Sequence, residues 1–439
     1  MFETGGVVRG ATTADVVRWT SAVAELRPVA DDAERIDRIA ALERLKAACA
    51  AAQAEVTAEL VRSQRTAAAS AGQDRTRTDR SIAAQVAFAR RESPHAGRRH
   101  VGLAMALIDE MPGTLTALRD GSIPEWRAVL VARQLGCLTA EARRKAETEL
   151  APRLPALGDQ AAVAAATTVA YRLDPEAVLD RMRNTVSDRR VSLRPAPDTM
   201  VRLSALLPVA GGVAAYAPLL RAADSSHASD GTRTRGQVMA DELVARLTGR
   251  SNSGCDELGV PDAGAPDVHI GLLMTDRTLL DADAEPAVLN GCGPIPAPLA
   301  RRLVDAGAGT ASPASVWVRR CWTDPSTGSV AVSDRRPRLF PASIRRLVVW
   351  RDQRCRTPWC GAPVRDIDHV HPFRAGGSTV QTNAKGLCRS RNLAKDQLGW
   401  HAPGRPDGAV VTETPTGHRY VSHPPPPSSE PWRDDLVST

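Results

Sequence analysis

The sequence predicts a mainly α-helical protein with α+β parts, in which a helical N-terminal domain with a few β-hairpins precedes a small C-terminal α+β module. Apolar residues recur every three or four positions through most of the first half of the chain, which is the period of amphipathic helices. Several later stretches alternate apolar and polar residues, as half-buried strands do. Three of the eight cysteines gather between Cys355 and Cys388, so we expect a metal site in the module.

The helices are separated by Gly and Pro residues. The first long helix begins at Asp31-Asp32 and is expected to bury a face that includes Ile36, Ile39 and Leu42. After a polar break over 72–80, Ser81 is expected to cap the next helix. The predicted helices cover 14–26, 32–60, 82–88, 100–111, 114–120, 124–135, 139–150, 159–171, 175–188, 213–223, 237–247, 296–305, 341–351 and 389–398.

The strands are shorter and fall in the second half of the chain and just before it. Residues 190–194 and 200–204 flank a Pro-rich turn and predict a hairpin. Residues 316–322 and 329–333 predict a second hairpin, and 268–274, 287–290 and 364–368 predict single strands.

These breaks and changes of pattern divide the chain into four segments. They are a lead-in (1–28), a mainly helical domain (29–334), the module (335–405) and a flexible Pro-rich tail (406–439). Residues 249–266 are rich in Gly, Ser, Pro and Asp and are a candidate linker inside the helical domain. Because aromatic residues make up only 3% of the chain, we expect Ala and Val to fill most of the core.

The positive charge is concentrated in one stretch. The 439 residues have a formal net charge of +7, and residues 335–400 carry twelve Arg and two Lys against four acidic residues, a local net charge of +10. The rest of the chain is therefore slightly acidic, at −3. A concentrated positive surface is typical of proteins that bind a phosphate backbone. We expect a nucleic-acid partner, with double-stranded DNA as the first choice.

Other classes of protein are disfavoured. The first residues do not combine a basic start with a long apolar run, so no signal peptide is expected. No stretch reaches the about eighteen uninterrupted apolar residues of a membrane span, and no G-x4-GK[ST] phosphate-binding loop occurs. Bunched cysteines indicate metal ligation in a reducing compartment rather than disulfides. We therefore expect a cytoplasmic protein that does not contact a membrane.

The residues around the cysteines have the types that metal-dependent phosphodiester hydrolysis requires. Such chemistry needs an oxygen ligand for the ion, a base for water and a cation near the phosphate. Asp368 and His369 end a predicted strand, where they would point to opposite faces and serve different partners. Asn392 and Lys395 lie three residues apart on a predicted helix and share a face.

The order Asp-His, then Asn, then Leu-Cys-x-x-x-Asn-x-x-Lys resembles the HNH endonuclease module, whose ββα-metal fold holds one catalytic divalent ion. The resemblance implies that His369 is the general base and that Asp368 and Asn392 bind Mg²⁺, Mn²⁺ or Ni²⁺. It implies that Asn383 fixes the loop under the base and that Lys395 lies near the scissile phosphate. Asn392 stands where many members have His, as in the HNN-type variant.

Many HNH modules also hold a structural zinc between two cysteine pairs. The corresponding positions here are Cys355, Cys360, Cys388 and Arg391, so the fourth ligand is replaced. Three thiolates can bind zinc with a water or a borrowed ligand, whereas a closed structural site has four protein ligands. Whether zinc is bound stays open, and Cys321 is one residue that could supply the missing ligand.

Several basic residues beside the motif are candidates for binding DNA, namely Arg351, Arg354, Arg389 and Arg391.

The helices and the TRTRGQVMADELVARLTG segment resemble a bacterial domain of unknown function that commonly precedes HNH modules. Two alternatives to a nuclease remain. The module could be a degenerate form that binds DNA without cutting it, or the helical domain could be a scaffold that binds a protein partner.

Overall fold

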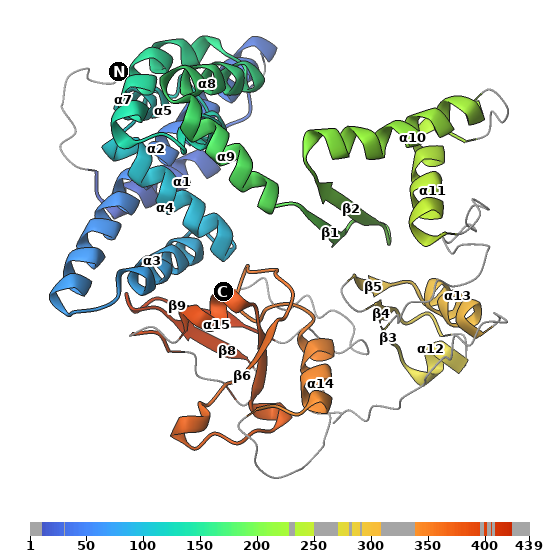
Figure 1. The fold of residues 1–439 in the computed structure, drawn as a ribbon. Coiled ribbons are helices and arrows are strands. Elements are labelled where there is room, and N and C mark those ends of the chain that lie inside the picture. The colour runs from blue at the N-terminus through green and yellow to red at the C-terminus, as the bar shows by residue number, and fades with distance from the viewer. Residues whose placement is uncertain are drawn as a thin grey trace. The chain divides into compact units, whose positions relative to one another are not determined.

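The structure is a computed structural model, and it describes residues 11–29, 31–227, 233–249, 271–280, 283–289, 292–308, 339–395, 399–401, 405 and 409–423. The described chain is mainly helical with small antiparallel sheets, which confirms the predicted fold class (Figure 1). The chain divides into two compact units. One unit combines Met1–Val56 with Met105–Leu173, and the other combines Thr57–Ala104 with Asp174–Thr439.

The first unit is an array of helices. Glu147, which is 5% exposed, accepts a hydrogen bond of 2.7 Å from the backbone N–H of Thr114 and so caps a helix that has no cap of its own. Large buried side chains such as Leu118, Val131 and Leu150 fill the core between the helices. The helices are α1 (Thr13–Ala24), the start of α2 (Asp32–Ser70), the end of α4 (Pro94–Asp109), α5 (Pro112–Arg119), α6 (Glu125–Leu135), α7 (Ala140–Leu150), η1 (Ala151–Ala156) and α8 (Asp159–Leu173).

The face that α2 buries differs from the predicted one. Ile36 and Ile39 are 65% and 62% exposed, whereas Ala51 and Ala58 are 1% exposed and Val61 is fully buried. Alanine permits close approach of neighbouring helices, and the spacing of the large apolar residues therefore identified the wrong face. The expectation that Ala and Val fill the core is confirmed here.

The next helix, α3 (Arg75–Ala89), begins earlier than predicted. Asp74 is its N-cap and accepts a hydrogen bond of 2.8 Å from the backbone N–H of Arg77. Ser81, which was expected to be the cap, lies inside the helix and is buried. The prediction failed because the basic run at the start of α3 reads as a polar break, although it forms the first turns of the helix.

The second unit contains the rest of the chain. The hairpin of β1 (Arg190–Pro195) and β2 (Val201–Leu206) is confirmed and pairs Ser192 with Ser204. Apart from Gly249, the candidate linker over 249–266 lies outside the described residues, and so does the hairpin predicted over 316–333. The other elements before residue 339 are α9 (Pro175–Ser187), α10 (Val209–His227), α11 (Arg235–Thr248), β3 (Leu272–Leu273), α12 (Asp276–Leu280), β4 (Ala287–Leu289), β5 (Gly293–Ile295) and α13 (Ala297–Ala308).

The described residues from 339 to 423 make up what we call the C-terminal module. Its strands β8 and β9 form a hairpin inside the segment that was predicted to be a flexible tail, so that prediction is wrong for 410–422. The tail beyond residue 423 lies outside the described residues. The elements are α14 (Ala342–Asp352), β6 (Asp366–His369), η2 (Phe373–Ala375), η3 (Gln381–Asn383), β7 (Ala384–Leu387), α15 (Arg389–Ala394), β8 (Val410–Glu413) and β9 (Arg419–Ser422).

Helix α3 packs against the C-terminal module within the second unit. The Phe88 ring is 1% exposed and stacks on Tyr420, with centroids 4.6 Å apart. The same ring lies 5.9 Å from Trp400 and 6.4 Å from Trp359. The indole Nε1–H of Trp400 donates a hydrogen bond of 2.9 Å to Ser81 Oγ. Residues far apart in the sequence therefore share one aromatic core.

Among the described residues, no single helix has the length and apolar composition needed to cross a membrane, although the bent pair α4 and α5 does.

Candidate functional site

The candidate site is built on two antiparallel strands and the helix that follows them. Strand β6 pairs with β7, with Asp368 opposite Lys385 and His369 opposite Ala384. Helix α15 begins directly after Cys388 and packs against β6. Because side chains alternate along a strand, Asp366 and Asp368 face α15 while Ile367 and His369 face the opposite side. The expected separation of Asp368 from His369 is what the contacts show.

The face of β6 that meets α15 gathers carboxylates, an amide and two ammonium groups. Asn392 Nδ2 donates a hydrogen bond of 3.1 Å to Asp366 Oδ2. Lys395 Nζ lies 2.9 Å from Asp368 Oδ1, and Lys385 Nζ lies 3.6 Å from Asp368 Oδ2. The structure thus brings Asp368, Asn392 and Lys395 to one face, together with Asp366 and Lys385.

Two of these groups are strongly desolvated. The Lys385 side chain is 3% exposed, and burial lowers the pKa of its ammonium, which the carboxylate of Asp368 opposes. Within the described part of the chain, Asp368 Oδ2 is buried and accepts no hydrogen bond. The Lys385 ammonium lies 3.6 Å from it, beyond hydrogen-bond distance, so the oxygen keeps its capacity to bind a metal ion, and oxygen ligands are the ones that Mg²⁺ and Mn²⁺ prefer. The residues present therefore fit the implied divalent ion.

His369 lies on the other side of the strand. Its Nε2 is 3.0 Å from Thr379 Oγ1, and its ring lies 4.3 Å from the ring of Phe340 and 5.7 Å from that of Phe373. These contacts hold the imidazole in one orientation while leaving it half-buried. A fixed, partly accessible imidazole is suited to proton transfer.

Asn383 anchors the loop that follows His369. Its Oδ1 accepts a hydrogen bond of 2.7 Å from the backbone N–H of His371, and its Nδ2 donates to the carbonyl oxygens of His371 (3.0 Å) and Ser378 (2.8 Å). Gly377 lies so close that a Cβ there would be 1.9 Å from the His371 carbonyl oxygen. The carboxamide of Asn383 is engaged with the loop backbone, so the residue has a positioning role.

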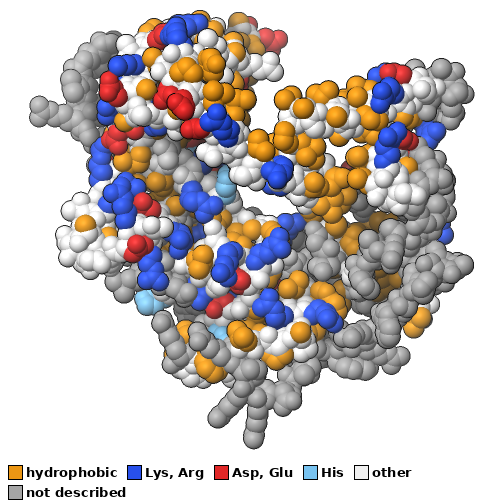
Figure 2. All heavy atoms as spheres, viewed as in Figure 1, with side chains coloured by type: hydrophobic (Ala, Val, Ile, Leu, Met, Phe, Trp, Pro, Cys, Tyr) orange, Lys and Arg blue, Asp and Glu red, His pale blue; other side chains and the backbone are white. Residues whose placement is uncertain are grey.

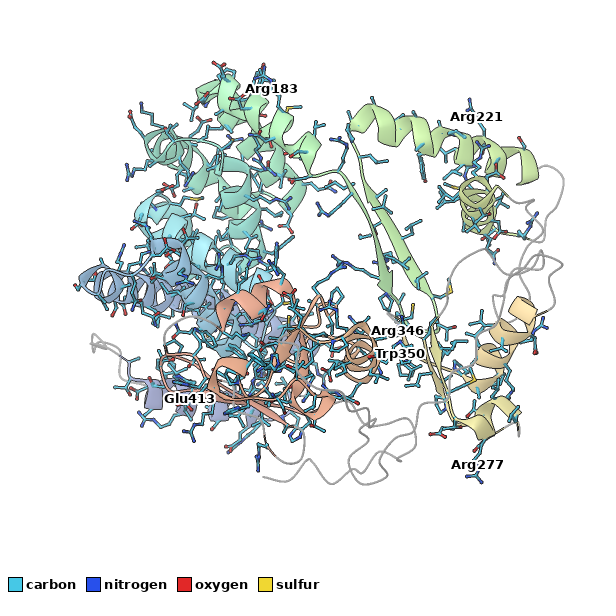
Figure 3. The ribbon with its side chains drawn as sticks, turned by 60° about the horizontal axis from the view of Figure 1, so that its bottom comes forward. Arg183, Arg221, Arg277, Arg346, Trp350 and Glu413 are labelled. Carbon is cyan, nitrogen blue, oxygen red and sulfur yellow. The ribbon has the colours of Figure 1, made fainter. Side chains whose placement is uncertain are left out.

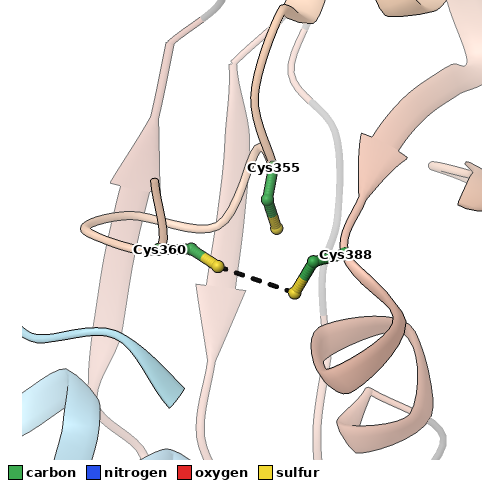
Figure 4. A group of neighbouring side chains, drawn as sticks. All are labelled: Cys355, Cys360 and Cys388. Carbon is green, nitrogen blue, oxygen red and sulfur yellow. Dashed lines mark hydrogen bonds between the residues drawn. The ribbon is translucent and has the colours of Figure 1, made fainter. Parts of the chain in front are cut away.

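The three cysteines form a second cluster next to this one. Their sulphur atoms all lie within 4.8 Å of one another, and all three residues are buried (Figure 4). Cys360 Sγ and Cys388 Sγ are 3.6 Å apart. Hydrogen bonds from the other two thiols lower the pKa of Cys355 far below its usual value. The cluster could therefore hold one metal ion.

Arg391 stands in the sequence where the fourth zinc ligand is expected, and the structure bears on its predicted role in binding DNA. The residue is 4% exposed, and its guanidinium lies 4.3 Å from the centre of the Phe88 ring. None of its three nitrogens has a hydrogen-bond partner among the described residues. Burial lowers the pKa of Arg391, and the thiols of Cys360, Cys355 and Cys388 act in the opposite direction. A side chain buried in this way cannot reach a nucleic acid, so the predicted role of Arg391 in binding DNA is wrong.

The side chain of Arg351 is also engaged in hydrogen bonds within the module. It donates hydrogen bonds to both carboxylate oxygens of Asp352 and to the carbonyl oxygen of Ala384, at 2.7, 3.0 and 2.6 Å. Asp352 is fully buried and accepts a 2.7 Å hydrogen bond from the backbone N–H of Gly386 in β7. Arg351 therefore supports β7.

The two remaining predicted arginines are accessible. Arg354 is exposed and donates a hydrogen bond of 2.8 Å to the carbonyl oxygen of Gly361. The Arg389 side chain is 71% exposed, and its guanidinium lies 3.3 Å from Asp366 Oδ1. On α14, Arg345 and Arg346 are exposed while Ile344 and Val348 face the core; Arg346 is labelled with Trp350 in Figure 3.

Comparison with known proteins places most of the chain in a protein family. Residues 38–352 match the family described as "Domain of unknown function (DUF222)". The chain belongs to the DUF222 family. A relative described as "Uncharacterized protein Rv3776", from Mycobacterium tuberculosis (strain ATCC 25618 / H37Rv), is 29% identical over 228 residues. The match covers 44% of this chain and 41% of that protein, so this DUF222 chain spans less than half of the relative's length. No solved structure matches the chain.

The DUF222 match ends at Asp352, the last residue of α14. The residues of the candidate site lie beyond that point, whereas α3, which packs against the module, lies inside the family domain. Sequence reasoning missed Asp366, Lys385 and Phe88. The first lies two positions before Asp368 on the same strand face, and the second lies opposite Asp368 in the register, so both could have been found from an antiparallel pairing of β6 and β7.

Proposed function

We propose that the C-terminal module is an HNH-type endonuclease that hydrolyses DNA phosphodiester bonds with a divalent metal ion. The observation that carries this proposal is the arrangement of the site on β6, β7 and α15. One face presents Asp366, Asp368, Asn392 and Lys395, and the adjacent strand position presents His369, held by Thr379. The surrounding positive charge supports a polyanionic substrate.

In the proposed reaction, His369 accepts a proton from the attacking water as its oxygen bonds to phosphorus. The bond from phosphorus to the leaving oxygen then breaks, and that oxygen takes a proton from solvent. Asp368 and Asn392, with Asp366 beside them, would hold the ion, which when bound polarises the phosphate and stabilises the developing negative charge. Lys395 places a second positive charge beside the phosphate, and Asn383 keeps the loop of His369 in place.

Nicking of supercoiled plasmid with Mg²⁺, Mn²⁺ or Ni²⁺ tests the proposal. His369→Ala is expected to lower the rate by about 10²- to 10⁴-fold, the usual contribution of a general base. The matched control is His371→Ala, since His371 is exposed and its backbone rather than its imidazole makes the loop contacts. Activity that survives His369→Ala, or that falls equally with His371→Ala, would contradict the assignment of His369 as the general base.

We further infer that Cys355, Cys360 and Cys388 hold Zn²⁺. Thiolate ligands favour zinc over the hard ions of the catalytic site. Three thiolates and one Zn²⁺ carry a net charge of −1, which the guanidinium of Arg391 offsets. Metal analysis of the purified protein, with Cys360→Ser as the comparison, tests this inference. A protein that contains no zinc, or the same amount of zinc in the variant, would contradict it.

Binding of DNA without cleavage is the second candidate function. It is favoured by the two lysines that already neutralise Asp368, since a carboxylate paired with Lys385 and Lys395 is less available to a metal ion. Salt-sensitive binding of DNA together with no cleavage under any divalent ion would support this candidate over the nuclease.

A further inference from the structure

A second concentration of positive charge lies within the DUF222 domain. Residues 75–99 contain seven arginines against two acidic residues, Asp79 and Glu92, a local net charge of +5 in a region of the chain that is otherwise slightly acidic. Both acidic residues are engaged by nearby cations: Asp79 contacts Arg65 and Arg75, and Glu92 contacts Arg90 and His100. The stretch covers α3 and the start of α4.

These helices are fixed against the nuclease module. The aromatic core around Phe88 joins α3 to the module, and Trp400 donates its hydrogen bond to Ser81 on α3. Helix α3 also packs directly on α15, the helix that carries Asn392. The arginines of α3 and α4 therefore have a defined position relative to the proposed catalytic helix.

One arginine of α4 reaches α15 itself. Arg98 Nη1 donates a hydrogen bond of 3.0 Å to Ser390 Oγ, the residue that follows the exposed Arg389. Arg80 and Arg98 line one hollow together with Ser390. Arg98 and Arg99 are exposed, and neither forms an ion pair with a carboxylate in the described part of the chain. Figure 2 shows Lys and Arg side chains gathered on the face where α3 and α15 lie.

We propose that α3 and α4 bind the phosphate backbone of the nucleic acid, with Arg98 and Arg99 as the main contacts and Arg80 beside them. This inference rests on the proposed function and gives the DUF222 domain a part in it. A nucleic acid that runs past Arg389 meets the charges of α4 next, because Arg98 touches the neighbouring residue Ser390. Arginine side chains suit this task, since each guanidinium can form two hydrogen bonds with a phosphate.

Binding of a labelled DNA duplex at several salt concentrations tests the proposal, with His369→Ala as the parent so that cleavage does not interfere. Arg98→Gln/Arg99→Gln removes two phosphate contacts. The slope of log K against log salt is expected to fall by about 1.8, which at about 0.1 M salt corresponds to about 60-fold weaker binding. Arg98→Lys/Arg99→Lys keeps both charges and is expected to restore most of the slope.

The matched control is Arg133→Gln/Arg221→Gln, which removes the same charge from exposed positions on α6 and α10. Unchanged binding by the Arg98/Arg99 variant, or an equal loss in the control, would overturn the proposal. Arg99→Gln alone changes an exposed side chain that forms no ion pair in the described part of the chain; it is expected to lower the slope by about 0.9 and serves if the double variant does not fold.

Two further measurements separate the outcomes. If the protein with His369 intact nicks plasmid while the Arg98/Arg99 variant binds DNA normally, this inference fails and the nuclease proposal stands. If the protein neither binds nor cuts DNA, both fail. Binding that polyglutamate displaces as readily as DNA would indicate an acidic protein partner and would also overturn the proposal.

Discussion

Replacing Phe88 by alanine is expected to destabilise the C-terminal module selectively. The ring is 1% exposed and touches Tyr420, Trp400 and Trp359 from the module. Removing a buried Phe side chain costs about 3–5 kcal/mol. The change also uncovers the guanidinium of Arg391, whose contact with a desolvated ring is worth up to about 2 kcal/mol. A loss of about 4 kcal/mol is a large share of the about 5–15 kcal/mol that stabilises a domain.

Urea unfolding followed by tryptophan fluorescence measures this loss, because Trp359 and Trp400 are in contact with the deleted ring. With a slope of about 2 kcal/mol per M, the transition reported by these residues is expected to fall by about 2 M. Ile39→Ala is the control: Ile39 is apolar and is 62% exposed, so its loss is expected to cost less than about 0.5 kcal/mol. Equal midpoints for the parent and Phe88→Ala would refute the packing of α3 on the module.

Four other changes have defined outcomes. Gly377→Ala places a Cβ 1.9 Å from the carbonyl oxygen of His371, so the loop must move and plasmid nicking should be lost. The circular dichroism spectrum should match that of the parent, because the change affects only this loop. Asn383→Ala leaves loop donors and acceptors without partners, which should cost about 1–3 kcal/mol and speed hydrogen exchange at the His371 amide; unchanged exchange would contradict the anchoring role. Arg391→His supplies a fourth zinc ligand and should slow removal of zinc by a chelator; faster removal would count against the three-thiolate site. Burial lowers the pKa of Lys385 from 10.5, so the unfolded state binds more protons than the folded state between the two values, and stability should rise with pH there. Lys385→Met should flatten that rise in urea midpoints measured between neutral and alkaline pH.

Much of the helical domain could be predicted because its boundaries are local. Thr139 and Asp174 accept hydrogen bonds at the starts of α7 and α9, and these caps can be read directly from the sequence. The buried face of α2 could not be predicted in the same way. Its core contacts are made by alanines, and Ile36 and Ile39 remain exposed, so residue size gives the wrong face.

In the site too, contacts between neighbouring elements could be predicted from the sequence, whereas a contact between distant residues could not. Asp368, Asn392 and Lys395 come together because two strands and a helix that are adjacent in the chain place them there. The burial of Arg391 depends on Phe88, about 300 residues earlier in the chain, and no pattern near either residue indicates the contact. Without that partner, Arg391 reads as one more basic residue of a positively charged helix.

The shared aromatic core also has a consequence for how the protein is made. Phe88 leaves the ribosome about 330 residues before Tyr420. At about 5–20 residues per second, the ring waits about 20–60 s for the strand on which it stacks. During translation α3 therefore exposes an apolar surface that stays incomplete until β9, the last strand among the described residues, has been made, and a nascent chain stalled before that point presents this surface to chaperones and proteases.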